Sequence, residues 1–354
     1  MSVADHDRIP EIALGWIAEG KRAALATVVQ TWGSAPRPTG SQLVISGAGE
    51  IMGSVSGGCV EGAVIVEALD ALEDGECRIL EYGVSDDEAF AVGLACGGTI
   101  RIMVEPIDVG KGPTSALLKT LVDARAGREA AVYAVDTATW ERRIIAAGAP
   151  DPLAAAVAQR LATDKSGFEM TEAGAVFLGV HNPPLRLIVV GAVHIAQALM
   201  PMARLAGYDA SLVDPRDAFG SAARFPGETI LHDWPDEALD ALGLDARTAV
   251  ITLTHDPKLD DPAIRRAIRS PAFYLGCLGS KKTHAKRVAR LQEAGFSEDE
   301  IGRIDSPLGA DIGSATPAEI AISALAQLTE RLRRPETRPP ESHQGAAPRQ
   351  DAAA

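Results

Sequence analysis

The sequence predicts an α/β protein with two folded parts: a C-terminal parallel sheet covered by helices, and an N-terminal mixed α/β domain with cysteine loops. Segment 185–217 runs from a hydrophobic strand through a glycine and a helix to a second strand that ends in an acid. This is the order of a βαβ unit that opens a doubly wound, Rossmann-like sheet. Residues 9–108 mix strand-like and helix-like patterns, and two glycine-rich loops there each carry one cysteine.

The length of 354 residues is natural for two or three domains, and 46% hydrophobic residues can fill sizeable cores. We expect the cysteine-loop domain at 1–110 and a small α/β extension and linker at 111–184, ending at the proline pair of "HNPP". The Rossmann-like domain should occupy 185–334. The last segment, 335–354, is rich in Pro, Gln and Ala, and we expect it to be disordered.

Charge and cysteine usage exclude several classes of protein. A formal net charge of −14 argues against electrostatic binding of nucleic acid. The N-terminus does not resemble a signal peptide, and no apolar run is long enough to span a bilayer. Four widely spaced cysteines form neither a disulfide framework nor a zinc pattern. We therefore predict a reduced, cytoplasmic protein.

Local patterns predict the elements in chain order. The first part should hold strands at 22–33, 41–47 and 99–107 and a helix at 60–72; the extension should hold a helix at 115–126 and strands at 128–136 and 175–180. In the last part, the βαβ unit is followed by strands at 248–255 and 272–280, each leading into a helix.

The glycine loop of the βαβ unit departs from the dinucleotide fingerprint G-x-G-x-x-G/A. Gly191 and Ala196 match it, but Val193 holds the middle position, where a side chain would meet the pyrophosphate. Asp214 ends the next strand, where an acid can accept hydrogen bonds from ribose hydroxyls. His194, in the first turn of the helix, can meet an anion or simply cap or pack. A Rossmann-like sheet without a bound dinucleotide is an equally good interpretation.

Two further strand ends lie where open α/β sheets bind ligands. "THDPKLD" carries His255, and "GSKKTH" brings Ser280, Lys281 and Lys282 to a helix N-terminus, which suits a phosphate. The lysines could instead be solvated surface. The segment 307–321 is explained by helix initiation, with Thr316 as the N-cap.

The cysteines fall into two kinds. Cys77 and Cys277 have apolar neighbours and fit small core residues. The other two stand among glycines, where a core is not expected and where successive N–H groups can bind an anion. Such a sulfur could ligate a soft metal, form a covalent adduct or carry a transferable sulfur. The loop residues expected to contact a ligand are Gly57, Gly58, Cys59, Cys96, Gly97 and Gly98.

Taken together, the motifs resemble the XdhC/CoxI family, accessory proteins of molybdenum hydroxylases such as xanthine dehydrogenase. The similarity covers nearly the whole folded chain. The matching pieces, in order, are "GSVSGGCVEG", "GLACGGTIRIMVEP", "LRLIVVGAVHIAQAL", "VDPRDAFGSAARFPG", "THDPKLD", "YLGCLGSKKTHAKRVARLQEAG" and "PLGADIGSATPAEIA".

The resemblance implies a dimeric cytoplasmic chaperone that is not itself a turnover enzyme. Such proteins bind the molybdenum cofactor (Mo-molybdopterin), protect it while a cysteine desulfurase supplies its terminal sulfur, and insert it into an apo molybdenum hydroxylase. On this interpretation Cys59 and Cys96 contact the metal end. The phosphate would lie toward Ser280–Lys282 and His194, in a crevice between the two domains.

Two other functions remain open at this point. The chain could be an NAD(P)-dependent oxidoreductase with Cys59 as a redox thiol, which Asp214 favours and Val193 opposes. It could also be a scaffold that binds partners and has lost its ligand pocket.

Overall fold

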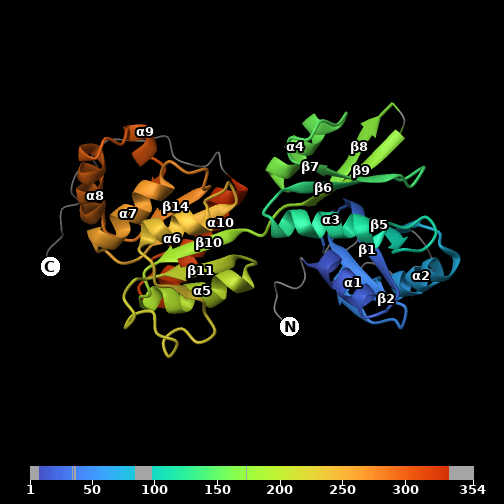
Figure 1. Cartoon of the computed structure of the whole chain (residues 1–354), viewed down its shortest axis with the longest axis horizontal. Coiled ribbons are helices and arrows are strands. Elements are labelled where there is room, and N and C mark those ends of the chain that lie inside the picture. The colour runs from blue at the N-terminus through green and yellow to red at the C-terminus, as the bar shows by residue number, and fades with distance from the viewer. Residues whose placement is uncertain (1–7, 34, 36, 84–97, 173, 335–354) are drawn as a thin grey trace, which may run out of the picture. The chain divides into compact units, whose positions relative to one another are not determined.

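The computed structural model describes residues 8–33, 35, 37–83, 98–172 and 174–334. The chain divides into two compact units, residues 1–184 and 185–354. Figure 1 labels most of the helices and strands of both. The expected fold class is confirmed: an N-terminal unit that mixes helices with antiparallel sheets, and a C-terminal unit built on a parallel six-stranded sheet.

The first sheet of the N-terminal unit has the strand order β3-β2-β1-β5-β4, and its neighbouring strands are antiparallel. Three helices accompany it. The elements are α1 (Ile9–Ala18), β1 (Ala23–Trp32), β2 (Gln42–Ser46), β3 (Ile51–Gly53), α2 (Glu61–Asp74), β4 (Arg78–Tyr82), β5 (Thr99–Pro106) and α3 (Ser115–Ala126).

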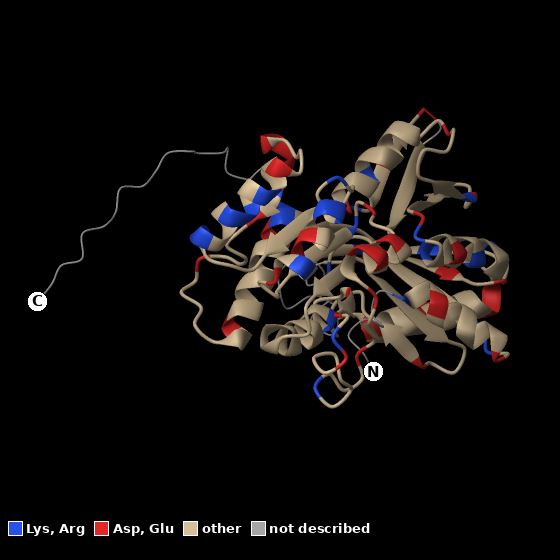
Figure 2. Cartoon of the chain, turned by 60° about the vertical axis from the view of Figure 1, so that its left-hand side comes forward, with Lys and Arg blue, Asp and Glu red and all other residues tan. Residues whose placement is uncertain are grey.

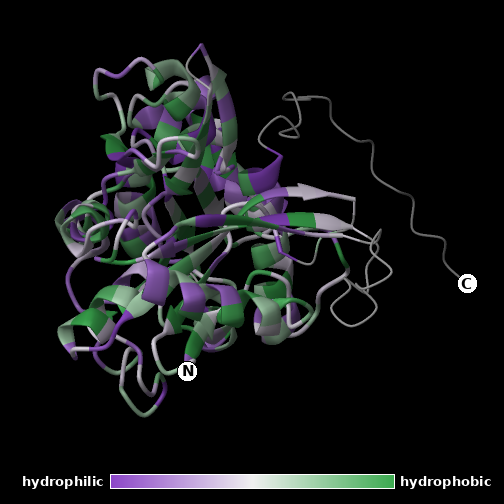
Figure 3. Cartoon of the chain, turned by 90° about the vertical axis from the view of Figure 1, so that its right-hand side faces the viewer, coloured by the Kyte–Doolittle hydropathy of each residue, from purple (hydrophilic) through white to green (hydrophobic). Residues whose placement is uncertain are grey.

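Helices cover both faces of this sheet because successive strand residues point to opposite sides. Ala24 and Ala26 of β1 belong to a core that includes the apolar side of α2. Ala23 and Leu25 belong to a second core with α1 and α3. Figure 3 shows hydrophobic and hydrophilic residues alternating along the helices of this unit, as burial of one side requires.

A second antiparallel sheet follows, with the strand order β7-β6-β9-β8. One face packs on α3 and on β1 and β5, and α4 covers the other. Arg142 of β7 ties this sheet to the first: its Nε donates to the buried Glu105 of β5 at 2.7 Å. The elements are β6 (Ala131–Asp136), β7 (Arg142–Ala146), α4 (Ala154–Thr163), β8 (Gly167–Thr171) and β9 (Gly174–His181).

The C-terminal unit holds a parallel sheet in the order β12-β11-β10-β13-β14-β15. The strand order reverses between β10 and β13, which makes that edge the topological switch point. The elements are β10 (Arg186–Val190), α5 (His194–Leu205), β11 (Asp209–Val213), β12 (Ile230–Leu231), α6 (Pro235–Leu242), β13 (Thr248–Thr252), α7 (Pro257–Ala267), β14 (Tyr274–Cys277), α8 (Lys281–Glu293), α9 (Glu298–Ile301), β15 (Ile304–Asp305) and α10 (Pro317–Arg333).

Both faces of the parallel sheet are buried, so its central strands are continuously apolar. Leu187 and Val189 of β10 pack with α5 and α10, whereas Ile188 and Val190 pack with α6, α7 and α8. The capping box expected at Thr316 is confirmed: its side chain accepts from the Glu319 N–H, and the Glu319 carboxylate accepts from the Thr316 N–H.

Every element predicted within the described residues is present, and several others are additional. In the N-terminal unit the sequence patterns did not predict α1, β3, β4, β7, α4 and β8, which are short or flank the main strands. In the C-terminal unit they did not predict β12, α6, α9 and β15. The extra strands complete the edges of the three sheets. Across the residues that the structure describes, no helix combines the length and apolar character needed to cross a bilayer.

Candidate functional site

Cys59 lies in the loop between β3 and α2, one residue before the helix N-cap Val60. Its side chain is half-buried, with its apolar side on the core beneath α2. Gly57 and Gly58 precede it with φ of 73° and 109°. These are left-handed values that glycine adopts without strain. The backbone conformation of the two glycines therefore places Cys59 at the N-terminus of α2.

Glu61, the first residue of α2, organises this loop from within. Its Oε1 accepts hydrogen bonds from the N–H groups of Val55 (3.2 Å) and Ser56 (2.9 Å) and from Ser54 Oγ (2.8 Å). Its Oε2 accepts from the Gly58 N–H at 2.9 Å and from Ser56 Oγ. Burial by itself would raise the pKa of Glu61, but these hydrogen bonds outweigh it and lower the pKa from 4.5 to about 2.

The remaining loop amides are also paired, with one exception. The Gly57 N–H donates to Ser54 Oγ and the Val60 N–H to Ser56 Oγ, both at 2.9 Å. Within residues 54–60, the Cys59 N–H is the one backbone donor without such a partner. Hydrogen bonds thus hold this loop in place, and the Cys59 thiol and amide are the groups left to bind a ligand.

The other cysteines divide as follows. Cys96 and Gly97, two of the residues expected to bind the ligand, lie outside the described residues, and Gly98 is buried directly before β5. The core positions predicted for Cys77 and Cys277 are confirmed. Burial raises the pKa of the Cys77 thiol to about 11 and that of Cys277 to about 12. Both thiols are therefore protonated and inert at neutral pH.

The Gly191 loop of the C-terminal unit is closed by contacts within the chain. Gly191 has φ 113°, and a Cβ there would meet Thr254 Cγ2 at 2.5 Å. The Ala192 N–H donates to Asp214 Oδ2 at 2.8 Å, and Arg224 Nη1 donates to the Ala192 carbonyl at 2.9 Å. Val193 is the N-cap of α5, and its side chain packs on the core below.

Asp214, the residue expected to contact a ribose, is held by contacts within the chain. It is fully buried, and besides Ala192 it accepts from the Arg216 N–H (3.0 Å), Nε (2.8 Å) and Nη2 (2.7 Å). Burial opposes ionisation, but the hydrogen bonds from Arg216 and Ala192 outweigh it and lower the pKa of Asp214. Both carboxylate oxygens of Asp214 already accept hydrogen bonds from Arg216 and Ala192. Arg216 therefore occupies the positions that ribose hydroxyls would use.

The other predicted residues of this unit lie at the carboxyl edge of the parallel sheet. His194 is exposed at the start of α5, and Lys281 is exposed at the start of α8. Ser280 is the N-cap of α8 and accepts from the Thr283 N–H at 3.2 Å. His255 and Lys282 are brought together, because both line a pocket between the loop after β13 and the first turns of α8.

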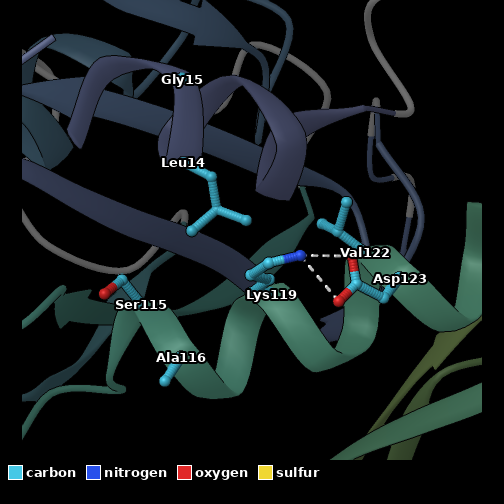
Figure 4. Close-up of a pocket in the computed structure, with 7 residues that line it drawn as sticks. All are labelled: Leu14, Gly15, Ser115, Ala116, Lys119, Val122 and Asp123. Carbon is cyan, nitrogen blue, oxygen red and sulfur yellow. Dashed lines mark hydrogen bonds and ion pairs between the residues drawn. The ribbon is translucent and has the colours of Figure 1, made fainter. Parts of the chain in front are cut away.

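A second hollow lies between α1 and α3 of the N-terminal unit (Figure 4). Lys119 and Asp123, its charged residues, are paired with each other at 2.7 Å. The lining consists of Leu14, Gly15, Ser115, Ala116, Lys119, Val122 and Asp123. It holds no cysteine, histidine or unpaired charge. Nowhere among the described residues do three or more His, Cys, Asp or Glu side chains form a group that could hold a metal ion.

The sequence patterns did not single out Glu61 and Arg216, which hold the two loops, or Lys286, which lines the pocket at α8. Glu61 could have been found, because an acid in the first helical turn after two serines can accept from loop amides. Arg216 carried a weaker signal, its spacing of two residues from Asp214. Lys286 lies one turn beyond Lys282 on the expected helix.

The fold and these sites define a class: a two-unit α/β protein with a thiol-presenting loop in one unit and a Rossmann-like sheet in the other. The sequence model for the "XdhC Rossmann domain" matches residues 187–328, and that for the "XdhC and CoxI family" matches residues 16–83. The chain belongs to the XdhC and CoxI family.

Relatives match over nearly the whole chain. The Escherichia coli (strain K12) molybdenum cofactor insertion chaperone PaoD is 30% identical over 324 residues, which cover 92% of this chain and 88% of PaoD. A probable xanthine dehydrogenase subunit from Bacillus subtilis (strain 168) is 26% identical over 331 residues, 90% of this chain and 96% of that protein. A crystal structure of a xanthine dehydrogenase from Bacillus halodurans shares the fold, with a TM-score of 0.72, 24% identity, and coverage of 94% and 96%.

Proposed function

We propose that this chain is a molybdenum-cofactor chaperone that holds the cofactor during maturation and inserts it into an apo molybdenum hydroxylase. The observation that carries the proposal is the half-buried Cys59 thiol, held at the start of α2 by a loop whose amides are fixed by Glu61. The full-length similarity to PaoD, a protein named for cofactor insertion, supports it.

The chemistry of the Cys59 loop suits this cargo. A thiol is a soft ligand that matches a sulfur-coordinated metal, and a half-buried thiol can be covered by a ligand without moving the chain. The neighbouring Cys59 amide adds one hydrogen-bond donor. Cys96, with Gly97, is the second proposed contact, on the grounds of its glycine-rich sequence motif.

The finer parts of the function are also proposals. A cysteine desulfurase would supply the terminal sulfur while the chain shields the cofactor, and two chains would pair as a dimer. The client would be a hydroxylase of the xanthine dehydrogenase type. The name of the Bacillus subtilis relative supports that class of client.

The rival function, an NAD(P)-dependent oxidoreductase, is not supported by the contacts of the Gly191 loop. Asp214 and the Ala192 N–H, the groups that a dinucleotide would use, are hydrogen-bonded to each other. A bound dinucleotide would have to break that bond and displace Arg216 from a buried carboxylate, which leaves charge unpaired.

The test is transfer of the cofactor. The chain is produced in a host that makes the cofactor, purified, and mixed with an apo molybdenum hydroxylase of the xanthine dehydrogenase type. We expect hydroxylase activity to return faster with the loaded chain than with an equal amount of free cofactor. A loaded chain that gives no more activity than free cofactor contradicts the insertion role, and a chain that never acquires molybdenum contradicts binding.

A further inference from the structure

The pocket at α8 has the position and size of a ligand site. It has a volume of about 330 Å³ and lies at the carboxyl ends of β13 and β14, the edge where open α/β sheets bind ligands. The lining residues are His255, Pro257, Asp260, Lys282, Thr283, Lys286, Arg287 and Arg290.

The charge in this pocket is positive and partly uncompensated. Lys282 and Lys286 stand on successive turns of α8, and Figure 2 shows Lys and Arg gathered along this helix. Neither lysine forms an ion pair with any residue that the structure describes. Arg290, one turn further, is neutralised by both oxygens of Asp261, at 2.6 and 2.8 Å.

The one acid of the pocket, Asp260, is committed to the protein. Its Oδ1 accepts from Thr254 Oγ1 at 2.6 Å, and its Oδ2 accepts from the His255 N–H at 3.1 Å. The second bond holds His255 at φ 62°, an uncommon conformation for a residue other than glycine. Asp260 thus shapes the wall of the pocket and leaves the two lysines without an internal counter-charge.

Arg287 supplies the independent sign of a missing acceptor. Its side chain is 2% exposed; its Nη2 lies 3.9 Å from Asp260 Oδ2, which balances its charge, and donates to the Leu278 carbonyl at 3.0 Å. Its Nε–H is buried without a hydrogen-bond partner among the described residues, although Arg287 lines the pocket. A buried donor without an acceptor is unfavourable, the more so on a charged group, so a ligand acceptor here would be stabilising.

We propose that this pocket binds the phosphate of a phosphomonoester, with Lys282 and Lys286 as counter-charges, Arg287 as a buried donor and the positive end of α8 beside them. A phosphomonoester carries a charge of about −1.5 to −2 at pH 7, which two lysines match, whereas a phosphodiester carries about −1. Lys282 and Lys286 are exposed, as is Lys281, but Lys281 lies outside the lining and is not part of this site. That the phosphomonoester is the one on molybdopterin rests on the proposed function.

The experiment titrates the purified chain with inorganic phosphate by calorimetry at constant ionic strength. We expect saturable binding by the wild-type chain and a loss of about tenfold or more in affinity in the double variant Lys282→Gln/Lys286→Gln. Lys258→Gln removes one positive charge from the N-terminus of α7, outside the lining, and should stay within about twofold of wild type. If the wild type does not bind phosphate, or if the double variant binds it with equal affinity, the proposal that this pocket binds phosphate is refuted.

Two further measurements fix the ligand class and separate this inference from the proposed function. Methyl phosphate should compete with inorganic phosphate, and dimethyl phosphate should compete about tenfold less well; equal competition overturns the monoester assignment. Molybdenum content is then compared in the wild type and the double variant. A chain that binds phosphate but never carries molybdenum refutes the chaperone function and leaves the pocket standing. Equal molybdenum content in both refutes the link to molybdopterin.

Discussion

The two units each place a glycine loop at the start of a helix, and in each a buried carboxylate occupies the loop. Before α2, Glu61 accepts from the amides of Val55, Ser56 and Gly58. Before α5, Asp214 accepts from the Ala192 amide and is neutralised by Arg216. The first loop also carries a side chain that can bind a metal or react, the thiol of Cys59. The second loop carries the apolar Val193 in its place.

A glycine-rich loop at a helix N-terminus is therefore not by itself an anion site. The N–H groups that could bind a ligand are also the groups that an internal acid can satisfy, and here it does so twice. What remains for a ligand is the thiol in the N-terminal unit and the lysine side chains of α8 in the C-terminal unit. Substitutions at the two carboxylates test whether they do what the contacts indicate.

Replacing Glu61 should have the largest effect. In Glu61→Gln the amide NH₂ faces at least one backbone N–H, that of Gly58 or those of Val55 and Ser56, whichever way it is placed. We expect a loss of about 3 kcal/mol in the free energy of unfolding, measured by urea titration. Glu73→Gln, on the exposed side of the same helix, should cost less than about 1 kcal/mol. A matched loss in both variants would mean that Glu61 does not organise the loop.

The same carboxylate predicts the response to acid. Its pKa is about 2 in the folded chain, below the ordinary 4.5, so its stabilising contribution is complete above about pH 4.5 and is lost as the pH falls toward 2. Across this range the free energy of unfolding of the wild type should fall by about 3 kcal/mol more than that of Glu61→Gln. Parallel stability curves for the two proteins would contradict the low pKa.

Asp214→Asn should lower the free energy of unfolding by about 2 kcal/mol, less than Glu61→Gln does. The Arg216 side chain left behind is one-third exposed and can turn to water, whereas the loop amides around Glu61 cannot. Asp217→Asn, at an exposed position three residues on, is the control and should be nearly neutral. A neutral Asp214→Asn would show that the Gly191 loop is not closed by this carboxylate.

The smallest stability effect belongs to Val193→Gly, which restores the dinucleotide fingerprint. We expect a loss of about 1 kcal/mol from reduced packing and greater backbone freedom. Fluorescence titration should still show no tight NADH binding, because Asp214 remains hydrogen-bonded to Ala192. Tight binding by the variant alone would assign the block to the valine side chain, and tight binding by the wild type would revive the oxidoreductase.

The fold could be predicted from sequence because its main signals are local and periodic. The apolar run of 187–190, followed by Gly191 and a helix, identifies the parallel sheet, and the buried positions of Cys77 and Cys277 follow from apolar neighbours. The short edge strands were missed because their residues are only partly buried, as the β4 and β8 patterns show. Such strands carry little hydrophobic periodicity.

The site was less predictable because it depends on which partner each polar group finds. Asp214 has the sequence position of a ribose ligand, but Arg216 and the Ala192 amide occupy it. Lys281 and Lys282 are adjacent in sequence, yet helical geometry places Lys282 with Lys286 in the pocket lining. Hydrogen bonds between residues far apart in sequence leave no local pattern to recognise.

The most direct test of the account is the molybdenum and molybdopterin content of the purified chain after production in a host that makes the cofactor. Cys59→Ala should reduce the content per chain severalfold while changing the free energy of unfolding by no more than about 1 kcal/mol, because the side chain is half-buried. Val66→Ala, at an exposed position on the helix α2 that follows Cys59, should retain the wild-type content. A Cys59→Ala chain that keeps the full wild-type content would contradict the role assigned to this thiol.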